Sequence, residues 1–214
     1  MRDTIRFDHV SMAFGEKEIF SDLSLSFASP GQYAILGPSG RGKTTLLRLI
    51  SGLQKPLSGT IAVPDAARIC FCFQEDRLLP WKTVLENVLL AVPSSCEPKV
   101  SKGRPESPLT GRWGRAPSSE ACSIARYWLQ QVGLAHEENS YPASLSGGMK
   151  RRASLARALA YNADILLMDE PFRALDDATH AKMLTLVREA AKDKLLILVT
   201  HDEADADGMK IVRI

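Results

Sequence analysis

Residues 37–44 read Gly37-Pro38-Ser39-Gly40-Arg41-Gly42-Lys43-Thr44, an uninterrupted match to the pattern G-x-x-x-x-G-K-[ST]. The preceding residues Gln32–Leu36 predict a short apolar strand, and the residues from Thr45 to Gly52 predict a helix closed by glycine. This order forms a cradle for nucleotide phosphates, because backbone N–H groups and the positive end of the helix dipole point at the anion. We expect the whole loop from Gly37 to Thr45 to hold the nucleotide, with Lys43 reaching the β- and γ-phosphates and Thr44 holding Mg²⁺. An ordinary glycine-rich turn is the alternative, and the intact motif disfavours it.

The composition is that of a soluble globular protein of one domain. The chain has 214 residues, of which 45% are hydrophobic and 24% are charged. Its longest apolar runs, such as Leu195–Val199, are far shorter than the ~20 residues needed to cross a bilayer. The four cysteines form no C-x₂-C pair, so neither a zinc site nor a disulfide framework is indicated. These features favour a cytoplasmic protein.

The net charge of +2 is concentrated in one segment. Residues 93–120 hold five Lys or Arg against three Glu, whereas the rest of the chain is balanced. This segment is rich in proline, serine and glycine, which predicts a flexible insertion rather than a basic stripe for nucleic acid. Lipid headgroups or a protein partner remain the alternative for it.

Hydrophobic patterning predicts an α/β fold. Strands are expected at 5–10, 23–27, 33–36, 60–63, 68–73, 165–169, 195–200 and 210–214. Helices are expected at 44–50, 84–90, 121–132, 150–160, 177–191 and, briefly, 203–207. The near-continuous apolar strands of the second half suit a parallel sheet covered on both faces, and the strand-rich opening predicts an antiparallel edge.

A second candidate site lies where the apolar stretch Ile165–Met168 ends in Asp169 and Glu170. Open α/β sheets bind ligands at the carboxyl ends of their strands. Because successive residues of a strand point to opposite sides, the two acids should have different roles. Asp169 suits Mg²⁺, through water, and Glu170 suits a general base for the attacking water. A plain surface pair of carboxylates is the alternative, and the phosphate loop argues against it.

A third stretch, Leu145-Ser146-Gly147-Gly148-Met149, precedes a predicted helix whose first turn holds Lys150, Arg151 and Arg152. Ser-Gly-Gly at a helix start is another anion cradle, and the cations conflict with the helix dipole unless phosphate binds there. An ordinary serine cap with a solvated basic turn is the alternative. Two cradles and one set of catalytic groups predict a head-to-tail dimer. In it, Ser146, Gly147 and Gly148 of one subunit cover the nucleotide of the other.

These motifs, in the order GPSGRGKT, Gln74, LSGGM, LLMDE, Ala174-Leu175-Asp176 and His201, resemble the nucleotide-binding subunit of an ATP-binding cassette (ABC) transporter over nearly the whole chain. The resemblance implies a single P-loop NTPase domain of ABC-ATPase type over residues 1–214. It implies a mostly parallel sheet core, an antiparallel β edge and a helical lobe at about residues 75–160. It further implies hydrolysis of ATP with Mg²⁺ at the cytoplasmic face of a membrane, by a peripheral subunit.

The resemblance also implies roles for single residues. Phe14 matches the aromatic that stacks on adenine, although tyrosine is commoner there. Gln74 matches the glutamine that senses Mg²⁺ in the catalytic site and links to the membrane subunits. Asp176 belongs to the loop that crosses the dimer interface, and His201 matches the histidine that contacts the γ-phosphate.

Three features depart from the family pattern. Met149 stands where glutamine is usual, which should be tolerated because backbone N–H groups and Ser146 do the binding. Arg173 is a bulky cation where a small residue is usual. The 93–120 stretch is longer and more polar than the family needs.

The segment Glu75–Val88 resembles the same region in importers of nitrate, sulfonates, taurine and similar small anions or metabolites. Leu78, Leu79 and Trp81 are expected to form an exposed apolar patch for a helix of another protein, with packing inside the small lobe as the alternative. The implied partners are a second copy of the chain, transmembrane permease subunits and an extracytoplasmic substrate-binding protein, without nucleic acid.

Two other functions are weaker readings of the same motifs. Soluble ABC-type ATPases that are not coupled to transport, but act on nucleic acid or ribosomes, usually carry two cassettes or a long coiled-coil insertion, and neither occurs in this sequence. A P-loop kinase or GTPase should have a phosphoryl-acceptor site or an N-K-x-D motif. The sequence has no N-K-x-D, and LSGGM has no role there.

Overall fold

The structure is a computed structural model that describes residues 4–93 and 117–214. Most of the insertion expected at 93–120 therefore lies outside the described residues. These residues form two compact units, one comprising the chain up to Arg77 together with Ala163–Ile214 and the other comprising Leu78–Asn162. A single domain with a helical lobe at about residues 75–160 stays a prediction.

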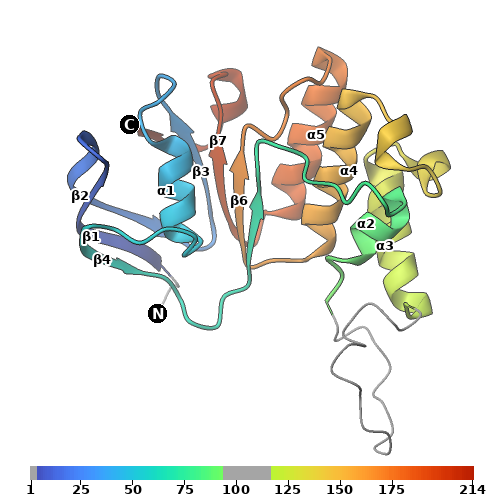
Figure 1. Ribbon diagram of the computed structural model, residues 1–214, viewed down its shortest axis with the longest axis horizontal. Helices are drawn as coiled ribbons and strands as arrows, with labels where there is room; N and C mark the ends of the chain where they lie inside the picture. Colours follow the sequence, from blue (N-terminus) through green and yellow to red (C-terminus); the bar gives the residue numbers. More distant parts are fainter. Residues whose placement is uncertain (1–3, 94–116) are drawn as a thin grey trace, which may run out of the picture. The chain divides into compact units, whose positions relative to one another are not determined.

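The first unit contains a five-stranded parallel sheet with the order β5-β6-β7-β3-β8 (Figure 1). Its strands are β3 (Gly31–Leu36), β5 (Ile69–Cys72), β6 (Ile165–Asp169), β7 (Leu195–Val199) and β8 (Lys210–Arg213). Every residue of β6 and β7 is buried, which explains why these strands are apolar or nearly so throughout, without alternation. The predicted α/β class with a parallel core is confirmed.

A three-stranded antiparallel sheet with the order β2-β1-β4 belongs to the same unit. Its strands are β1 (Thr4–Phe14), β2 (Lys17–Ala28) and β4 (Ser58–Ala62). The expected antiparallel edge is thus a separate sheet. β1 and β2 are also longer than the patterning predicts, because register shifts between Phe7 and Ala13 interrupt the alternation that marks a strand.

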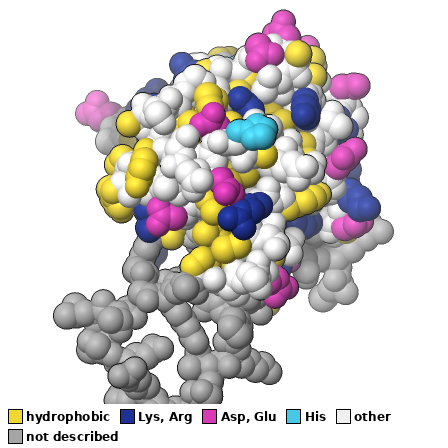
Figure 2. Space-filling model, turned by 90° about the vertical axis from the view of Figure 1, so that its right-hand side faces the viewer, with side chains coloured by type: hydrophobic (Ala, Val, Ile, Leu, Met, Phe, Trp, Pro, Cys, Tyr) yellow, Lys and Arg dark blue, Asp and Glu magenta, His cyan; other side chains and the backbone are white. Residues whose placement is uncertain are grey.

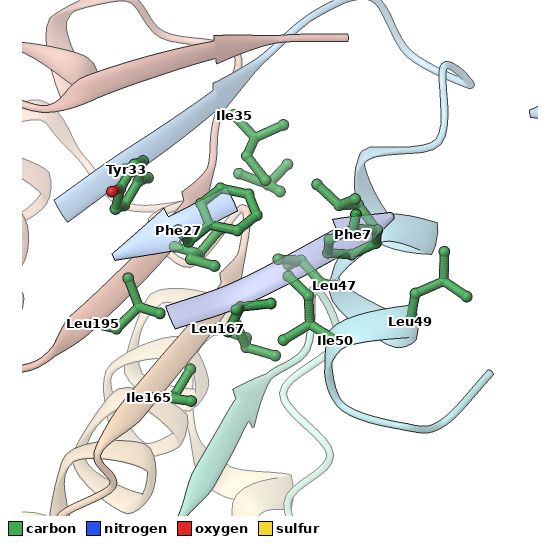
Figure 3. Packing of buried hydrophobic residues seen from close by; sticks show 14 of the residues in the cluster. Phe7, Phe27, Tyr33, Ile35, Leu47, Leu49, Ile50, Ile165, Leu167 and Leu195 are labelled. Carbon is green, nitrogen blue, oxygen red and sulfur yellow. The ribbon is translucent and has the colours of Figure 1, made fainter. Parts of the chain in front are cut away.

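The main hydrophobic core lies between the two sheets and helix α1 (Lys43–Ile50) (Figure 3). One face of the parallel sheet supplies alternate residues, such as Tyr33 and Ile35 of β3 and Leu167 of β6. Phe7 of β1 and Phe27 of β2 meet them from the antiparallel sheet, and the Phe27 ring packs edge-on against Tyr33 with centroids 5.0 Å apart. This packing fixes the strand that leads into residues 37–44 and the helix that follows them.

The other helical segments of the first unit are α5 (Asp177–Ala190) and the 3₁₀ turn η4 (Ala204–Ala206). The C-terminal end of α5 is tied to β3, because Gln32 Nε2 donates to the Arg188 carbonyl at 3.0 Å. The short helix expected at 203–207 is found as the single 3₁₀ turn η4.

The second unit is helical and contains α2 (Val84–Leu89), α3 (Ser119–Gln131) and α4 (Gly147–Ala160), with 3₁₀ turns η2 (Ala135–Glu137) and η3 (Pro142–Ser144). Thr83 and Glu86 form a capping box at the start of α2. α4 begins three residues before the expected Lys150, because the Ser146 side chain accepts from Met149 N and caps the helix.

Charges are mixed on the face that Figure 2 displays, where basic, acidic and hydrophobic side chains are interspersed among the coloured residues. Within residues 4–93 and 117–214, no helix is long and apolar enough to cross a membrane.

Candidate functional site

The loop of residues 37–44 joins β3 to α1 with Gly42 as the N-cap, in a left-handed conformation at φ 97° and ψ 10°. Lys43 is only 6% exposed, and its Nζ donates to the carbonyls of Gly37 at 2.7 Å and Pro38 at 2.9 Å. Its ammonium group is therefore held inside the curve of the loop, where the sequence places a phosphate-binding charge.

Thr44 connects this loop to strand β6. Its Oγ1 donates to Asp169 Oδ2 at 2.7 Å, and Asp169 is 3% exposed at the end of the strand. The structure thus brings together two of the three residues expected at the metal. Among the described residues there is no group of three or more His, Cys, Asp or Glu that fits a metal ion. A hydroxyl and a carboxylate oxygen suit Mg²⁺, which prefers oxygen ligands and binds through few protein groups together with water and phosphate oxygens.

Glu170 follows Asp169 and lies at the centre of a polar cluster. His201 Nε2 is 2.5 Å from Glu170 Oε1, and Gln74 Nε2 donates to Glu170 Oε2 at 3.1 Å. Arg173 Nη1 lies 3.9 Å from the same Oε2 atom, a contact that the sequence did not indicate. All three residues expected to be catalytic, Glu170, His201 and Gln74, therefore meet at one carboxylate.

Backbone contacts hold this cluster at the edge of the sheet. Glu170 N donates to the Val199 carbonyl at 3.0 Å, which ties the end of β6 to the end of β7. Thr200 N donates to the Ile35 carbonyl at 3.4 Å, which ties the end of β7 to β3. Glu170 itself has φ 45°, a left-handed conformation that is uncommon for a residue with a Cβ and is found where surrounding contacts enforce it.

A hollow of about 340 Å³ lies in front of these groups. Eight of the residues expected at the nucleotide or the metal line it, together with Glu170 and His201: Ser39, Gly40, Gly42, Lys43, Thr44, Thr45, Gln74 and Asp169. Gly37, Pro38 and Arg41 belong to the same loop without lining the hollow. Phe14 ends β1 with 49% of its surface exposed and does not line it either.

Asp176 lies at the N-cap of α5, where its Oδ1 accepts from Thr179 N at 3.0 Å. This backbone N–H holds the pKa of the Asp176 carboxyl below its ordinary value. Ala174, two residues earlier, has φ 65°, so the loop makes a tight turn between Glu170 and α5.

The stretch expected to form a second anion cradle is in the helical unit. Ser146 and Gly147 are exposed at the start of α4, and Gly148 is half-buried. Arg151 and Arg152, which follow this stretch, do not form the solvated basic turn that was the alternative interpretation. Arg151 is 2% exposed, and Arg152 Nη1 donates to the carbonyls of Val132 at 2.8 Å and Gly133 at 3.1 Å.

Sequence reasoning missed a set of contacts behind His201. Asp205 is 3% exposed, and its two oxygens meet Thr200 Oγ1 and His180 Nε2, each at 2.6 Å. Asp205 lies in a stretch with three other acids, Asp202, Glu203 and Asp207, so nothing in the sequence marks it as the buried one.

The comparison with families decides what this arrangement is. The sequence model of the family described as ABC transporter matches residues 20–173, which include the phosphate loop, the LSGGM motif and the Asp169-Glu170 pair. The chain belongs to the ABC transporter family. The resemblance found in the sequence is confirmed, and with it the enzyme class of an ABC-type ATPase.

Relatives within the ABC family are similar over most of this chain. The aliphatic sulfonates import ATP-binding protein SsuB 1 of Streptomyces avermitilis is 41% identical over 94% of this chain and 68% of its own length. The SsuB protein of Granulibacter bethesdensis is 43% identical over 92% of this chain and 73% of its own length. An SsuB 1 protein of Burkholderia cenocepacia is 36% identical over 99% of this chain, which spans 61% of that relative.

Solved ABC cassettes share the fold. A bacterial ABC transporter cassette, solved as a dimer, superposes with a TM-score of 0.81 at 29% identity, over 98% of this chain and 94% of its own. The same cassette in a post-hydrolysis state bound to ADP and Pi gives a TM-score of 0.79 at 29% identity, with the same coverage of both chains. The predicted ABC-ATPase fold is thereby confirmed.

Gly42→Ala should weaken nucleotide binding. A Cβ at Gly42 would require a left-handed alanine and would collide with Ile19 and with the Phe20 ring, so the loop would have to shift. We expect affinity for a fluorescent ATP analogue to fall at least about tenfold, measured by titration.

Gly52→Ala is the matched control for this variant. Gly52 also has a positive φ of 71°, but a Cβ there meets no atom within 4 Å. It should bind the analogue like the wild type. Equal affinities for both variants would contradict the assigned role of the loop.

Proposed function

We propose that this chain is the ATP-hydrolysing subunit of an ABC importer for small organic anions of the aliphatic sulfonate class. The observation that carries the proposal is the placement of Glu170 in contact with His201 and Gln74, at the edge of the hollow formed by the phosphate loop. The similarity to SsuB importer proteins supports the cargo class.

Nucleotide binding is an exchange of partners at Lys43. Its Nζ bonds to the Gly37 and Pro38 carbonyls, and in the proposed complex it turns to the β- and γ-phosphates. The backbone N–H groups from Gly40 to Thr45 and the start of α1 complete the cradle. Phe14 is exposed at the end of β1, and we assign it to the adenine ring.

Hydrolysis uses Glu170 as the general base. Its carboxylate takes a proton from water as the water oxygen attacks the γ-phosphorus and the bond to the ADP oxygen breaks. His201 Nε2 contacts the same carboxylate and can contact a γ-phosphate oxygen from there, while Gln74 fixes the second carboxylate oxygen. Thr44, Asp169 and Gln74 would hold Mg²⁺, which would supply positive charge to neutralise the phosphate oxygens.

The ATPase acts as a head-to-tail dimer in this proposal. The Ser146–Gly148 cradle lies exposed or half-buried at the N-terminus of a fourteen-residue helix, with its N–H groups available for an anion. Each cradle would close over the nucleotide held by the phosphate loop of the other copy. The similarity to a cassette solved as a dimer supports this arrangement.

Coupling to permease subunits would use the segment after Gln74. Trp81 is 69% exposed, whereas Leu78 and Leu79 are half-buried, so the expected apolar patch is centred on the tryptophan. Asn87 is fully buried and anchors this loop: its side chain accepts from Leu79 N at 2.7 Å and donates to the Leu79, Lys82 and Thr83 carbonyls at 2.9 to 3.1 Å. A rigid loop presents Trp81 to a partner helix at a low cost in entropy.

The remaining partners follow from the importer assignment. We place the dimer on the cytoplasmic face of the membrane, bound to transmembrane permease subunits that receive cargo from an extracytoplasmic binding protein. A soluble ABC-type ATPase that is not coupled to transport is the alternative.

Glu170→Gln should stop turnover and leave ATP binding intact, because the amide keeps the shape of the side chain but cannot accept the proton. Phosphate release should fall by about 10²-fold or more, and ATP should trap the dimer in size-exclusion chromatography. Glu189→Gln, at an exposed position on α5, is the control and should hydrolyse ATP normally. Unchanged hydrolysis in Glu170→Gln would remove this residue from its role.

The dimer can be tested by mixing two inactive variants, Lys43→Ala and Ser146→Arg. A head-to-tail heterodimer of the two contains one intact site, made of the phosphate loop of one subunit and the Ser146 cradle of the other. Phosphate release from the mixture should therefore exceed the sum of the separate variants. Mixing Lys43→Ala with the doubly substituted chain creates no intact pair and is the control. No gain in the first mixture would argue against a shared site.

The cargo class can be tested in cells. Replacing the chromosomal copy by Glu170→Gln should abolish uptake of a radiolabelled short-chain alkanesulfonate, with uptake of radiolabelled sulfate unchanged. Sulfonate uptake at the wild-type level would overturn the cargo assignment while leaving the ATPase assignment intact.

A further inference from the structure

The contacts behind His201 point to a role in catalysis for residues that touch neither the phosphate loop nor Glu170. A second hollow of about 290 Å³ shares Glu170 and His201 with the first one and is lined on its other side by His180, Thr200 and Asp205. We propose that Asp205 and His180 are positioning residues that fix the loop carrying His201 through the hydroxyl group of Thr200. This inference rests on the proposed function, because it concerns the same ATPase site.

Asp205 is the centre of this arrangement. Its Oδ2 accepts from the Thr200 hydroxyl and its Oδ1 contacts His180 Nε2, both at 2.6 Å. A carboxylate only accepts hydrogen bonds, so its contact with His180 Nε2 is a hydrogen bond in the forms of the imidazole that carry a proton on Nε2. A carboxylate that is 3% exposed is costly unless its oxygens are bonded, and here both are. These two contacts fix the position of the Asp205 carboxylate, and through it the positions of the Thr200 hydroxyl and the His180 ring.

Thr200 transmits this constraint to His201. It follows directly after β7, and its Oγ1 also accepts from Asp202 N at 3.1 Å. The residue before His201 thus carries this hydroxyl and the residue after His201 donates to it, while the hydroxyl itself donates to the buried Asp205 carboxylate. The His201 ring is 47% exposed, so its orientation toward Glu170 depends on its backbone rather than on close packing.

His180 anchors the other end of the network. It projects from α5 with its side chain 26% exposed, and its ring lies 5.0 Å from the Phe172 ring, centroid to centroid. Phe172 follows Glu170 by two residues and is buried. His180 thus contacts both the chain that leaves Glu170 and the carboxylate that fixes the His201 loop, so one network determines how the two catalytic side chains meet.

The test compares two substitutions of Thr200. Thr200→Val removes the hydroxyl and keeps the shape, and we expect kcat for ATP to fall about tenfold with KM changed less than about threefold. Thr200→Ser restores the hydroxyl and should return kcat to within about threefold of the wild type. A purely structural role would not separate these variants in this way once both show the wild-type melting temperature.

A second pair tests the other end and serves if Thr200→Val does not fold. His180→Gln keeps an N–H group near the place of Nε2 and should retain most of the activity, whereas His180→Phe keeps the ring and should lower kcat about as much as Thr200→Val. The double variant Thr200→Val/His180→Phe should be no slower than either single variant, since both break one network.

The outcomes separate the inference from the proposed function. If the wild-type protein and the Gly52→Ala variant hydrolyse no ATP, the proposed function fails. If the wild type is active and Thr200→Val or His180→Phe matches its conservative partner in kcat, the network has no positioning role and the inference is overturned.

Discussion

The site depends on the register of three parallel strands. Gly31 and Ile165 both pair with Leu195 at one end of the sheet, and Ile35 and Asp169 both pair with Val199 at the other. Strands of nearly equal length therefore stop at the same edge. Three groups are found at the ends of these strands: the phosphate loop, the Asp169-Glu170 pair and His201. Because the strands end at one edge of the sheet, these groups lie close together. A shift of one residue in any strand would turn its side chains to the opposite face and separate the groups.

Hydrogen bonds and polar contacts between these groups then fix their positions relative to one another. Thr44 and Asp169 join the loop to β6, and Glu170 meets His201 and Gln74. The groups come from segments far apart in the sequence, so their spacing is set by the sheet and not by local chain conformation. Preorganisation of this kind places charges where they are needed before the reaction begins.

The sequence was most informative where chemistry and position coincide. The phosphate loop, Asp169-Glu170 and His201 each follow an apolar strand, and their convergence follows from sheet topology. The limits of β1 and β2 were less predictable, because register shifts break the alternation of apolar residues. The pairing of Asp205 with His180 and Thr200 could not be predicted, since burial of one acid among four depends on tertiary packing. The same holds for Arg152, whose guanidinium binds carbonyls at the end of α3.

The left-handed backbone of Glu170 has a consequence for the stability of the fold. A residue with a Cβ is strained at φ 45°, and such strain persists only where surrounding contacts offset it. The Glu170 carboxylate supplies such contacts itself, with His201 on one oxygen and Gln74 on the other. A substitution that shortens this side chain would therefore keep the strain and lose the contacts that offset it.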